Sequence, residues 1–264
     1  MTVSRAHTIK PILSARGIVN RFGTQLVHDH LDLEIAPGEI LGIAGGSGTG
    51  KSVLLKTLIG LNPPHAGEVL MDGEPVGNMA PAKKATLIGA LFQQGALFSS
   101  LSVAQNIMFP LREYTTLPLQ EQKKIAAMKL ELAGLSAADG AKFPSALSGG
   151  MVKRAAFARA LALDPKILFL DEPTSDLDPL TASGIDTLIL QLNQTLGLTV
   201  VIVSHDLTTL MTVCTRMAIL VDKKIVTGKL DTLMHSKDPW IHEFLHGPRA
   251  RGVMATKEKK YGNG

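Results

Sequence analysis

The chain has 264 residues, of which 45% are hydrophobic and 19% are charged. This composition is typical of a globular protein and excludes a disordered or collagen-like chain. Its single cysteine, Cys214, excludes a disulfide framework and a multi-cysteine metal site, so we expect a reducing compartment. No apolar run approaches the roughly 18 residues of a membrane-spanning helix, and the N-terminus lacks the apolar segment of a signal peptide. We therefore expect a soluble, intracellular protein.

The formal net charge of +4 is concentrated at one end of the chain. Residues 247–264 contain five Lys or Arg and one Glu, so the residues before them are electrically neutral. This stretch is rich in Gly and has no periodicity, so we expect a mobile basic tail after a domain of residues 1–246. The tail is interpreted either as a solvated terminus or as a contact for a partner subunit or anionic lipid. A neutral body does not indicate a nucleic-acid partner.

In chain order, the first part of the sequence alternates short apolar runs with turns. Strands are expected at 27–35, 40–44 and 68–71, and a helix at 52–60. From about 98 to 164 strand-like runs are scarce, and three helices are expected, which open after Ser102, at Pro118 and after Ser148. We interpret this stretch as an inserted helical subdomain.

Strands and helices alternate again in the last part of the chain. The expected order is strand 166–170, helix 179–196, strand 198–203 and helix 206–214. A hairpin of 217–221 and 225–227 follows, with its turn at Lys223-Lys224. Such alternation predicts an α/β fold with a largely parallel sheet.

The strongest motif is a phosphate-binding loop between an apolar strand and a helix. It fits the pattern G-x-x-x-x-G-K-S and consists of Gly45, Gly46, Ser47, Gly48, Thr49, Gly50, Lys51 and Ser52. Its glycines let successive backbone N–H groups point at phosphate oxygens, and the helix N-terminus adds partial positive charge. Lys51 is expected to reach the β- and γ-phosphates, and the Ser52 hydroxyl is expected to bind Mg²⁺.

Two further apolar strands end in side chains suited to phosphate hydrolysis. Asp171 and Glu172 follow ILFL, at the sheet edge where open α/β sheets bind ligands. Asp171 is expected to hold Mg²⁺, and Glu172 to orient the attacking water. His205 follows TVVIV and is expected near the γ-phosphate. Gln93, with Gln94 as the neighbouring alternative, is a further candidate for contact with Mg²⁺ or the water.

A second anion-binding pattern, Ser148-Gly149-Gly150, opens the helix MVKRAAFARALAL. One nucleotide is not expected to be covered by two helix N-termini of one small domain. The simplest arrangement is a pair of chains, in which the Ser148 loop of one protomer contacts the γ-phosphate on the phosphate-binding loop of the other. We therefore expect a homodimer.

In this order, the five motifs resemble those of the ATP-binding subunits of ABC transporters, over residues 11–235. The resemblance implies an α/β P-loop fold with a mainly parallel sheet, an N-terminal antiparallel β subdomain and an inserted helical subdomain. It also implies that two such domains enclose two ATP molecules with Mg²⁺ and hydrolyse them. Residue by residue, it implies that Phe22 stacks on adenine and that Asp178 lies in the loop through which the two sites communicate.

A narrower resemblance, carried by residues 92–113 and 147–165, is to the ATPase subunit of Mla-type phospholipid transporters of Gram-negative bacteria. Met151 agrees with that group, whereas Asp176 departs from it. The resemblance implies a peripheral protein on the cytoplasmic face of the inner membrane. Its implied partners are a transmembrane permease pair, a periplasmic Mce-type lipid-binding protein and a small cytoplasmic regulatory subunit. Residues 95–113 are expected to form part of a groove for a cytoplasmic helix of the permease.

Three other functions were weighed against this one. A GTPase is excluded, because no Asn begins the guanine-reading motif N-K-x-D. A soluble ABC ATPase of translation or DNA repair is disfavoured, because such proteins carry two nucleotide domains or a long coiled-coil insertion. An ABC ATPase for another substrate, such as amino acids or lipoproteins, stays open.

Overall fold

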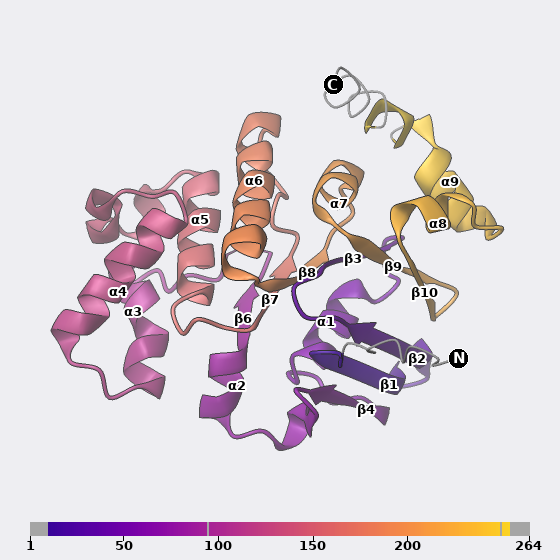
Figure 1. Ribbon diagram of the computed structural model, residues 1–264, viewed down its shortest axis with the longest axis horizontal. Coiled ribbons are helices and arrows are strands. Elements are labelled where there is room, and N and C mark those ends of the chain that lie inside the picture. Colours follow the sequence, from indigo (N-terminus) through magenta and orange to yellow (C-terminus); the bar gives the residue numbers. More distant parts are fainter. Residues whose placement is uncertain (1–9, 94, 249, 254–264) are drawn as a thin grey trace, which may run out of the picture.

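The computed structural model describes residues 10–93, 95–248 and 250–253 of the chain and contains two β-sheets (Figure 1). Its strands are β1 (Leu13–Phe22), β2 (Gln25–Ile35), β3 (Ile40–Gly45), β4 (Ala66–Met71), β5 (Glu74–Pro75), β6 (Ile88–Leu91), β7 (Ile167–Asp171), β8 (Thr199–Val203), β9 (Arg216–Val221) and β10 (Lys224–Gly228). The smaller sheet is antiparallel, in the order β2-β1-β4-β5. The larger sheet, in the order β10-β9-β3-β8-β7-β6, is parallel except for β10. Both sheets agree with the expected fold.

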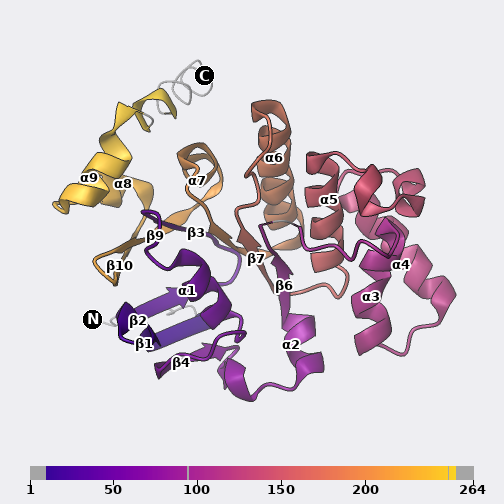
Figure 2. The same ribbon diagram turned by 180° about the vertical axis from the view of Figure 1, so that it is seen from behind.

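Three of the helices form a separate group at one end of the larger sheet, and the others lie around the two sheets (Figure 2). The helices are α1 (Lys51–Leu58), α2 (Pro81–Leu87), α3 (Val103–Tyr114), α4 (Leu119–Leu132), α5 (Gly149–Ala160), α6 (Pro179–Leu196), α7 (Leu207–Val213), α8 (Leu230–Met234) and α9 (Pro239–His246). α3, α4 and α5 are the end group, and the described residues between β6 and β7 contain no strand. The three helices expected from the sequence are thus confirmed. No helix in the described ranges is long and apolar enough to span a bilayer.

Capping residues explain where these helices begin. The Ser102 hydroxyl accepts a hydrogen bond from the Gln105 N–H at 3.2 Å, and the Gln105 side chain accepts one from the Ser102 N–H at 2.8 Å. This reciprocal arrangement is a capping box, which satisfies two backbone donors at the start of α3. The Asp178 carboxylate caps α6 by accepting hydrogen bonds from the N–H groups of Leu180 and Thr181, and Gly197, at a φ of 62°, ends the helix. The helix predicted over 179–196 is therefore confirmed at both ends.

Strands of the larger sheet are buried on both faces, so their side chains alternate between two cores. Along β7, Ile167 and Phe169 face the core shared with α1 and the antiparallel sheet, whereas Leu168 and Leu170 face the core under α5 and α6. All four side chains are fully buried. Burial of each contributes about 1.5–3 kcal/mol, and this packing fixes the height of Asp171 at the end of the strand.

The C-terminal part departs from expectation in two details. The β9–β10 hairpin turns at Asp222 and Lys223, one residue earlier than predicted; their φ angles of 47° and 64° suit a two-residue turn between twisted strands. Residues 250–253 are helical, and Ala250 is fully buried in the apolar cluster of α9. The boundary expected at 247 thus falls inside a packed segment, and the rest of the expected tail, 254–264, lies outside the described residues.

Candidate functional site

The carboxyl ends of four neighbouring parallel strands carry the main predicted site residues. Residues 45–52 follow from the end of β3, Glu172 follows β7, His205 follows β8 and Gln93 follows β6. β8 lies between β3 and β7, and β6 pairs with β7, so all of these groups are presented at one edge of the sheet. β8, which precedes His205, pairs directly with β7, which ends at Asp171.

The loop of residues 45–52 is shaped to receive an anion. Gly50 has a φ of 93°, in the left-handed region that glycine enters without steric cost. A Cβ on Gly50 would lie 2.4 Å from Val27 Cγ1 and 2.7 Å from His28 Nε2, so no larger residue fits there. Gly50 is also the N-cap of α1 and has no side chain to bond the first N–H groups of that helix. These donors are therefore available for phosphate oxygens.

Lys51 is folded back onto the loop that precedes it. Its Nζ donates hydrogen bonds to the carbonyl oxygens of Gly45 and Gly46, both at 2.9 Å. Burial lowers the pKa of Lys51, while the negative charges of Glu172 and Asp171 favour its protonated form. The ammonium is thus held over the loop by two weak acceptors that a phosphate could replace.

A tryptophan from the C-terminal part of the chain lies against the same loop. A Cβ on Gly46 would come within 3.7 Å of Trp240 Cζ2, and the Trp240 ring stacks on Phe244 of α9 at a centroid distance of 4.9 Å. Gly46 and Trp240 are far apart in the sequence, so no local sequence pattern could have indicated that they lie close together.

Two oxygen donors meet between the loop and β7. The Ser52 hydroxyl lies 3.4 Å from Asp171 Oδ1. Burial raises the pKa of Asp171, and the adjacent charge of Glu172 raises it further. A hydroxyl and a carboxylate are ligands that Mg²⁺ prefers, and a cation would offset the repulsion between the two carboxylates.

Glu172 is held in a strained and fully bonded position. Its φ of 50° is unusual for a non-glycine residue. Its N–H donates to the Val203 carbonyl at 2.8 Å, and its Oε2 accepts a hydrogen bond from the Ser204 hydroxyl at 3.2 Å. Its Oε1 lies 2.8 Å from His205 Nδ1. His205 itself keeps 69% of its side chain exposed, so it can reach a ligand at the sheet edge.

Lys153 of α5, which no motif in the sequence indicated, is a buried lysine that links α5 to the loops after β6 and β7. Its Nζ donates to the Glu172 carbonyl at 3.0 Å and also to the Gln93 carbonyl. Burial lowers the pKa of Lys153, whereas the charge of Asp176 favours the protonated form. The available signal was its position on the inner face of α5, three residues before the buried Ala156. Asp176, the unusual residue of its loop, has a left-handed φ of 62°.

The remaining predicted residues are Phe22, the Gln93 side chain and the loop of Ser148, Gly149 and Gly150. Phe22 is 51% exposed at the end of β1, and the Gln93 side chain is exposed after β6. Ser148 caps α5 by accepting from the Met151 N–H at 3.3 Å. A Cβ on Gly149 would lie 3.5 Å from Leu177, and one on Gly150 would lie 2.5 Å from Thr181. The Ser148-Gly149-Gly150 loop therefore packs beside the start of α6, where Asp178 is the N-cap.

Comparison with known proteins identifies the family. Residues 28–175 match the family model described as ABC transporter. The chain is 40% identical over 252 residues to the probable ribonucleotide transport ATP-binding protein mkl of Mycobacterium leprae, which covers 94% of this chain and 72% of that protein. It is 39% identical over 244 residues to the intermembrane phospholipid transport system ATP-binding protein MlaF of Escherichia coli, which covers 91% of this chain and 90% of that protein.

Solved structures agree with this result. An ATP-binding cassette in a dimeric post-hydrolysis state, bound to ADP and Pi, has a TM-score of 0.74 and 31% identity over 82% of this chain and 98% of its own. The protein cbiO1 from Clostridium perfringens, part of the ABC transporter complex cbiONQ, has a TM-score of 0.77 and 29% identity over 93% of this chain and 99% of its own. With the phosphate-binding loop and the Asp171-Glu172 pair at one sheet edge, the chain belongs to the ABC transporter family as an ATP-hydrolysing, ATP-binding subunit.

Proposed function

We propose that two copies of this chain enclose two ATP molecules with Mg²⁺ and that their hydrolysis drives a permease that moves phospholipids between membranes. The observation that carries the substrate class is the extent of the likeness to MlaF, which covers 91% of this chain and 90% of that protein. The mkl protein is as similar in identity, but the chain covers only 72% of it. Ribonucleotide transport, the activity in that relative's name, is the competing function.

Ser52 and Asp171 are the residues that would hold Mg²⁺, because their oxygens converge and are hard donors. Gln93 is the third proposed contact. Bound there, Mg²⁺ would neutralise charge on the β- and γ-phosphates. Burial and the adjacent charge of Glu172 raise the pKa of Asp171, and a cation bound there would favour its ionised form.

The chain's own residues supply the remaining steps. Lys51 exchanges its two carbonyl acceptors for phosphate oxygens, and the N–H groups of residues 45–52 bind the phosphates. Glu172, oriented by Ser204 and Val203, positions the water for in-line attack on the γ-phosphate. His205 contacts the γ-phosphate through the exposed part of its ring.

A second copy of the chain completes each site in this proposal. Ser148, Gly149 and Gly150 of the partner would cover the γ-phosphate, Phe22 would stack on adenine, and Asp178 would lie near the seam between protomers. Ser148 and Gly149 are exposed, as this arrangement requires. The similar ATP-binding cassette that was solved as a dimer bound to ADP and Pi supports the same arrangement.

The segment between β6 and α3 is suited to receive a permease helix. The Asn106 side chain holds it by bonding both the N–H and the carbonyl of Phe98 at 2.8 and 3.1 Å. Arg159 donates to the Gly95 and Ala96 carbonyls at 3.0 and 2.7 Å. Phe98 is 44% exposed on this rigid segment, close in sequence to Gln93. Docking here would place the chain on the cytoplasmic face of the inner membrane; the Mce-type and regulatory partners rest on the likeness to MlaF alone.

Two experiments test the proposal. The tagged chain should copurify with a permease and phospholipid, and phospholipid should stimulate ATP hydrolysis by the reconstituted complex; stimulation by ribonucleotides instead would favour the competing function. In a Cys214→Ser background, single cysteines at 96–102 should cross-link to the permease. Leu196→Cys, an exposed position at the end of α6, is the matched control, and cross-linking no better than this control would contradict the docking site.

A further inference from the structure

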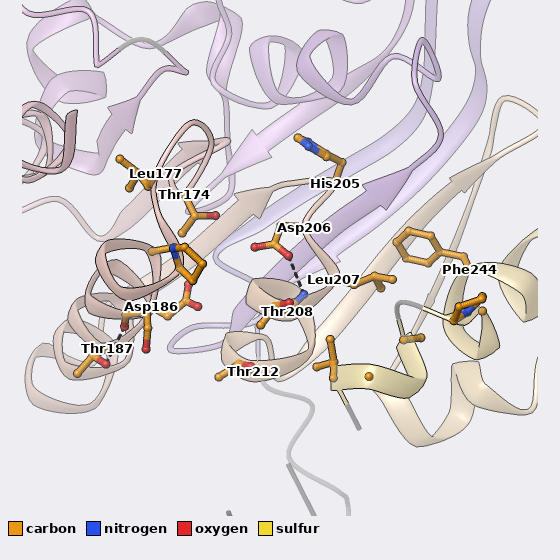
Figure 3. Close-up of a pocket in the computed structure, with 18 of the residues that line it drawn as sticks. Thr174, Leu177, Asp186, Thr187, His205, Asp206, Leu207, Thr208, Thr212 and Phe244 are labelled. Carbon is orange, nitrogen blue, oxygen red and sulfur yellow. Dashed lines mark hydrogen bonds between the residues drawn. The ribbon is translucent and has the colours of Figure 1, made fainter. Parts of the chain in front are cut away.

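A groove of about 1210 Å³ lies between α6, α7, α9 and residues 250–253, next to the sheet edge that carries His205 (Figure 3). His205 and Asp206, which follow β8, line the groove, and so does Asp186 of α6. Asp186 is only 7% exposed, and its Oδ1 has no hydrogen-bond partner among the described residues. A buried carboxylate with an unpaired oxygen is costly if it is ionised, so its protonation state needs an explanation.

The neighbouring Thr209 hydroxyl determines that state. Thr209 Oγ1 lies 3.1 Å from Asp206 Oδ2, 3.4 Å from Asp186 Oδ2 and 3.2 Å from Thr174 Oγ1. A hydroxyl has one proton and two lone pairs. Asp206 caps α7 by accepting a hydrogen bond from the Thr208 N–H at 2.9 Å, and its Oδ2 lies nearer to the Thr209 hydroxyl than Asp186 Oδ2 does. The Thr209 hydroxyl can donate to Asp186 or to Asp206 but not to both. When it donates to Asp206, Asp186 and Thr174 face its lone pairs and act as donors.

Only the undissociated carboxylic acid of Asp186 can donate a hydrogen bond. Burial raises the pKa of Asp186 to about 6; the Thr209 hydroxyl lowers it by less than burial raises it, and the negative charge of Asp206 on α7 raises it further. The other titratable groups facing this region are Cys214 at the end of α7, Glu243 of α9 and His205. Among the described residues that line the groove, none is Lys or Arg, so no fixed cation there favours an ionised Asp186.

Hydrogen bonds connect Asp186 to the catalytic carboxylate. Thr209 bonds Asp206, whose N–H donates to the Ser204 hydroxyl at 3.0 Å. That hydroxyl donates to Glu172 Oε2 at 3.2 Å. Thr174, on the loop after Glu172, bonds Thr209 from the other side. Thr209 thus ties the loop of Glu172 to the loop of His205, and Asp186 fills its last acceptor position.

We propose that Asp186 is a positioning residue that, as an undissociated acid, donates a hydrogen bond to Thr209 and so holds the Glu172 and His205 loops together. Ionisation removes the only proton that Asp186 can donate and leaves two carboxylates competing for the Thr209 hydroxyl. The loops are then less firmly held, and turnover falls without a change in ATP affinity. The inference rests on the roles of Glu172 and His205 in the proposed function.

The test compares ATP turnover by the full-length wild-type chain, Asp186→Asn and Asp186→Leu between pH 5.5 and 8.5. The Asn amide can donate to Thr209 at every pH, so the ratio of its kcat to the wild-type kcat should be near one at pH 5.5 and rise severalfold by pH 8. Asp186→Leu should lower kcat about tenfold at pH 5.5, the effect of one lost hydrogen bond. KM for ATP should stay within about twofold. A ratio that does not change with pH, or an effect confined to KM, would overturn the proposal.

A spectroscopic measurement detects the proton directly. At pH 5.5 the infrared band of undissociated carboxyl groups should be stronger in the wild type than in Asp186→Asn, and this difference should disappear toward pH 8. Asp222→Asn, a change in an exposed turn, is the matched control and should leave the band unchanged. If the Asp186 variants do not fold, Thr209→Val can be used instead: its carboxyl band should be shifted from the wild-type position and its kcat should be lower. An unshifted band would refute the hydrogen bond from Asp186 to Thr209.

The proposed role of Glu172 and the proposed role of Asp186 can fail separately. If Glu172→Gln hydrolyses ATP at the wild-type rate, the proposed mechanism fails. If Glu172→Gln is inactive but the Asp186→Asn ratio is the same at every pH and no difference in the carboxyl band is seen, only the role of Asp186 fails.

Discussion

The sheet edge around Glu172 and the start of α5 both present groups suited to phosphate, but they are held very differently. At the sheet edge, both carboxylate oxygens, the N–H and the carbonyl of Glu172 have partners within the chain. At the start of α5, Ser148 and Gly149 are exposed, and the Ser148 hydroxyl bonds its own helix. One chain therefore organises one half of a site in advance and leaves the other half facing outward, as expected if a second copy completes it.

The largest effect on ATP turnover should come from a substitution at the sheet edge, at Glu172. Glu172→Gln removes the carboxylate charge but keeps the shape, so turnover should fall by about 10²–10⁴-fold while ATP still binds. Because hydrolysis would no longer separate the protomers, the variant should form an ATP-dependent dimer, which size-exclusion chromatography detects. Wild-type turnover in this variant would show that the bonded position of Glu172 is only structural.

Gly50→Ala tests how tightly the phosphate loop is packed. Its Cβ would overlap Val27 and His28, and its φ would be strained, so the free energy of unfolding should fall by about 2–4 kcal/mol. Gly46→Ala is the matched control, since the nearest atom to its Cβ would be 3.6 Å away. Chemical denaturation without nucleotide measures both variants; equal stabilities would show that the loop can move away from β2.

The groove beside the organised half should add a pH dependence to stability. The pKa of Asp186 is raised from 3.8 to about 6, so wild-type stability contributed by the neutral acid is present below pH 4 and lost as pH rises toward 6. Asp186→Asn does not titrate, so its stability relative to the wild type should increase by about 2 kcal/mol between pH 4 and pH 7. Denaturation at both pH values checks this, and Asp222→Asn should show no such increase.

The smallest effect on folding should come from the outward half. Ser148→Ala removes a helix cap worth about 1 kcal/mol, and Ser102→Ala removes a comparable cap of α3. The two variants should be similarly destabilised, but only Ser148→Ala should weaken ATP-dependent dimerisation, measured in the Glu172→Gln background. Equal dimerisation of the two would remove the reason for assigning Ser148 to a partner's site.

Local sequence signals were sufficient for β2 to β4, for β7 to β10 and for α1 and α3 to α7, but not for β1, β5, β6, α2, α8 or α9. Helix caps such as Ser102 and Asp178 act within one turn, and the motif at 45–52 carries its own strand and helix. Lys153, Thr209 and Asp186 could not be assigned from the sequence, because their contacts arise only where α5, α6 and α7 meet the loops of Glu172 and His205. The tail boundary was placed too early because the burial of Ala250 depends on α9 and leaves no periodic pattern.

The contact between Gly46 and Trp240 has a practical consequence. Trp240 is the one tryptophan of the chain, and it lies against the loop where the phosphates are expected. Its fluorescence should therefore report nucleotide binding in the unlabelled protein, without background from any other indole. A titration with ATP would measure nucleotide affinity, and stopped-flow mixing would separate the binding step from hydrolysis.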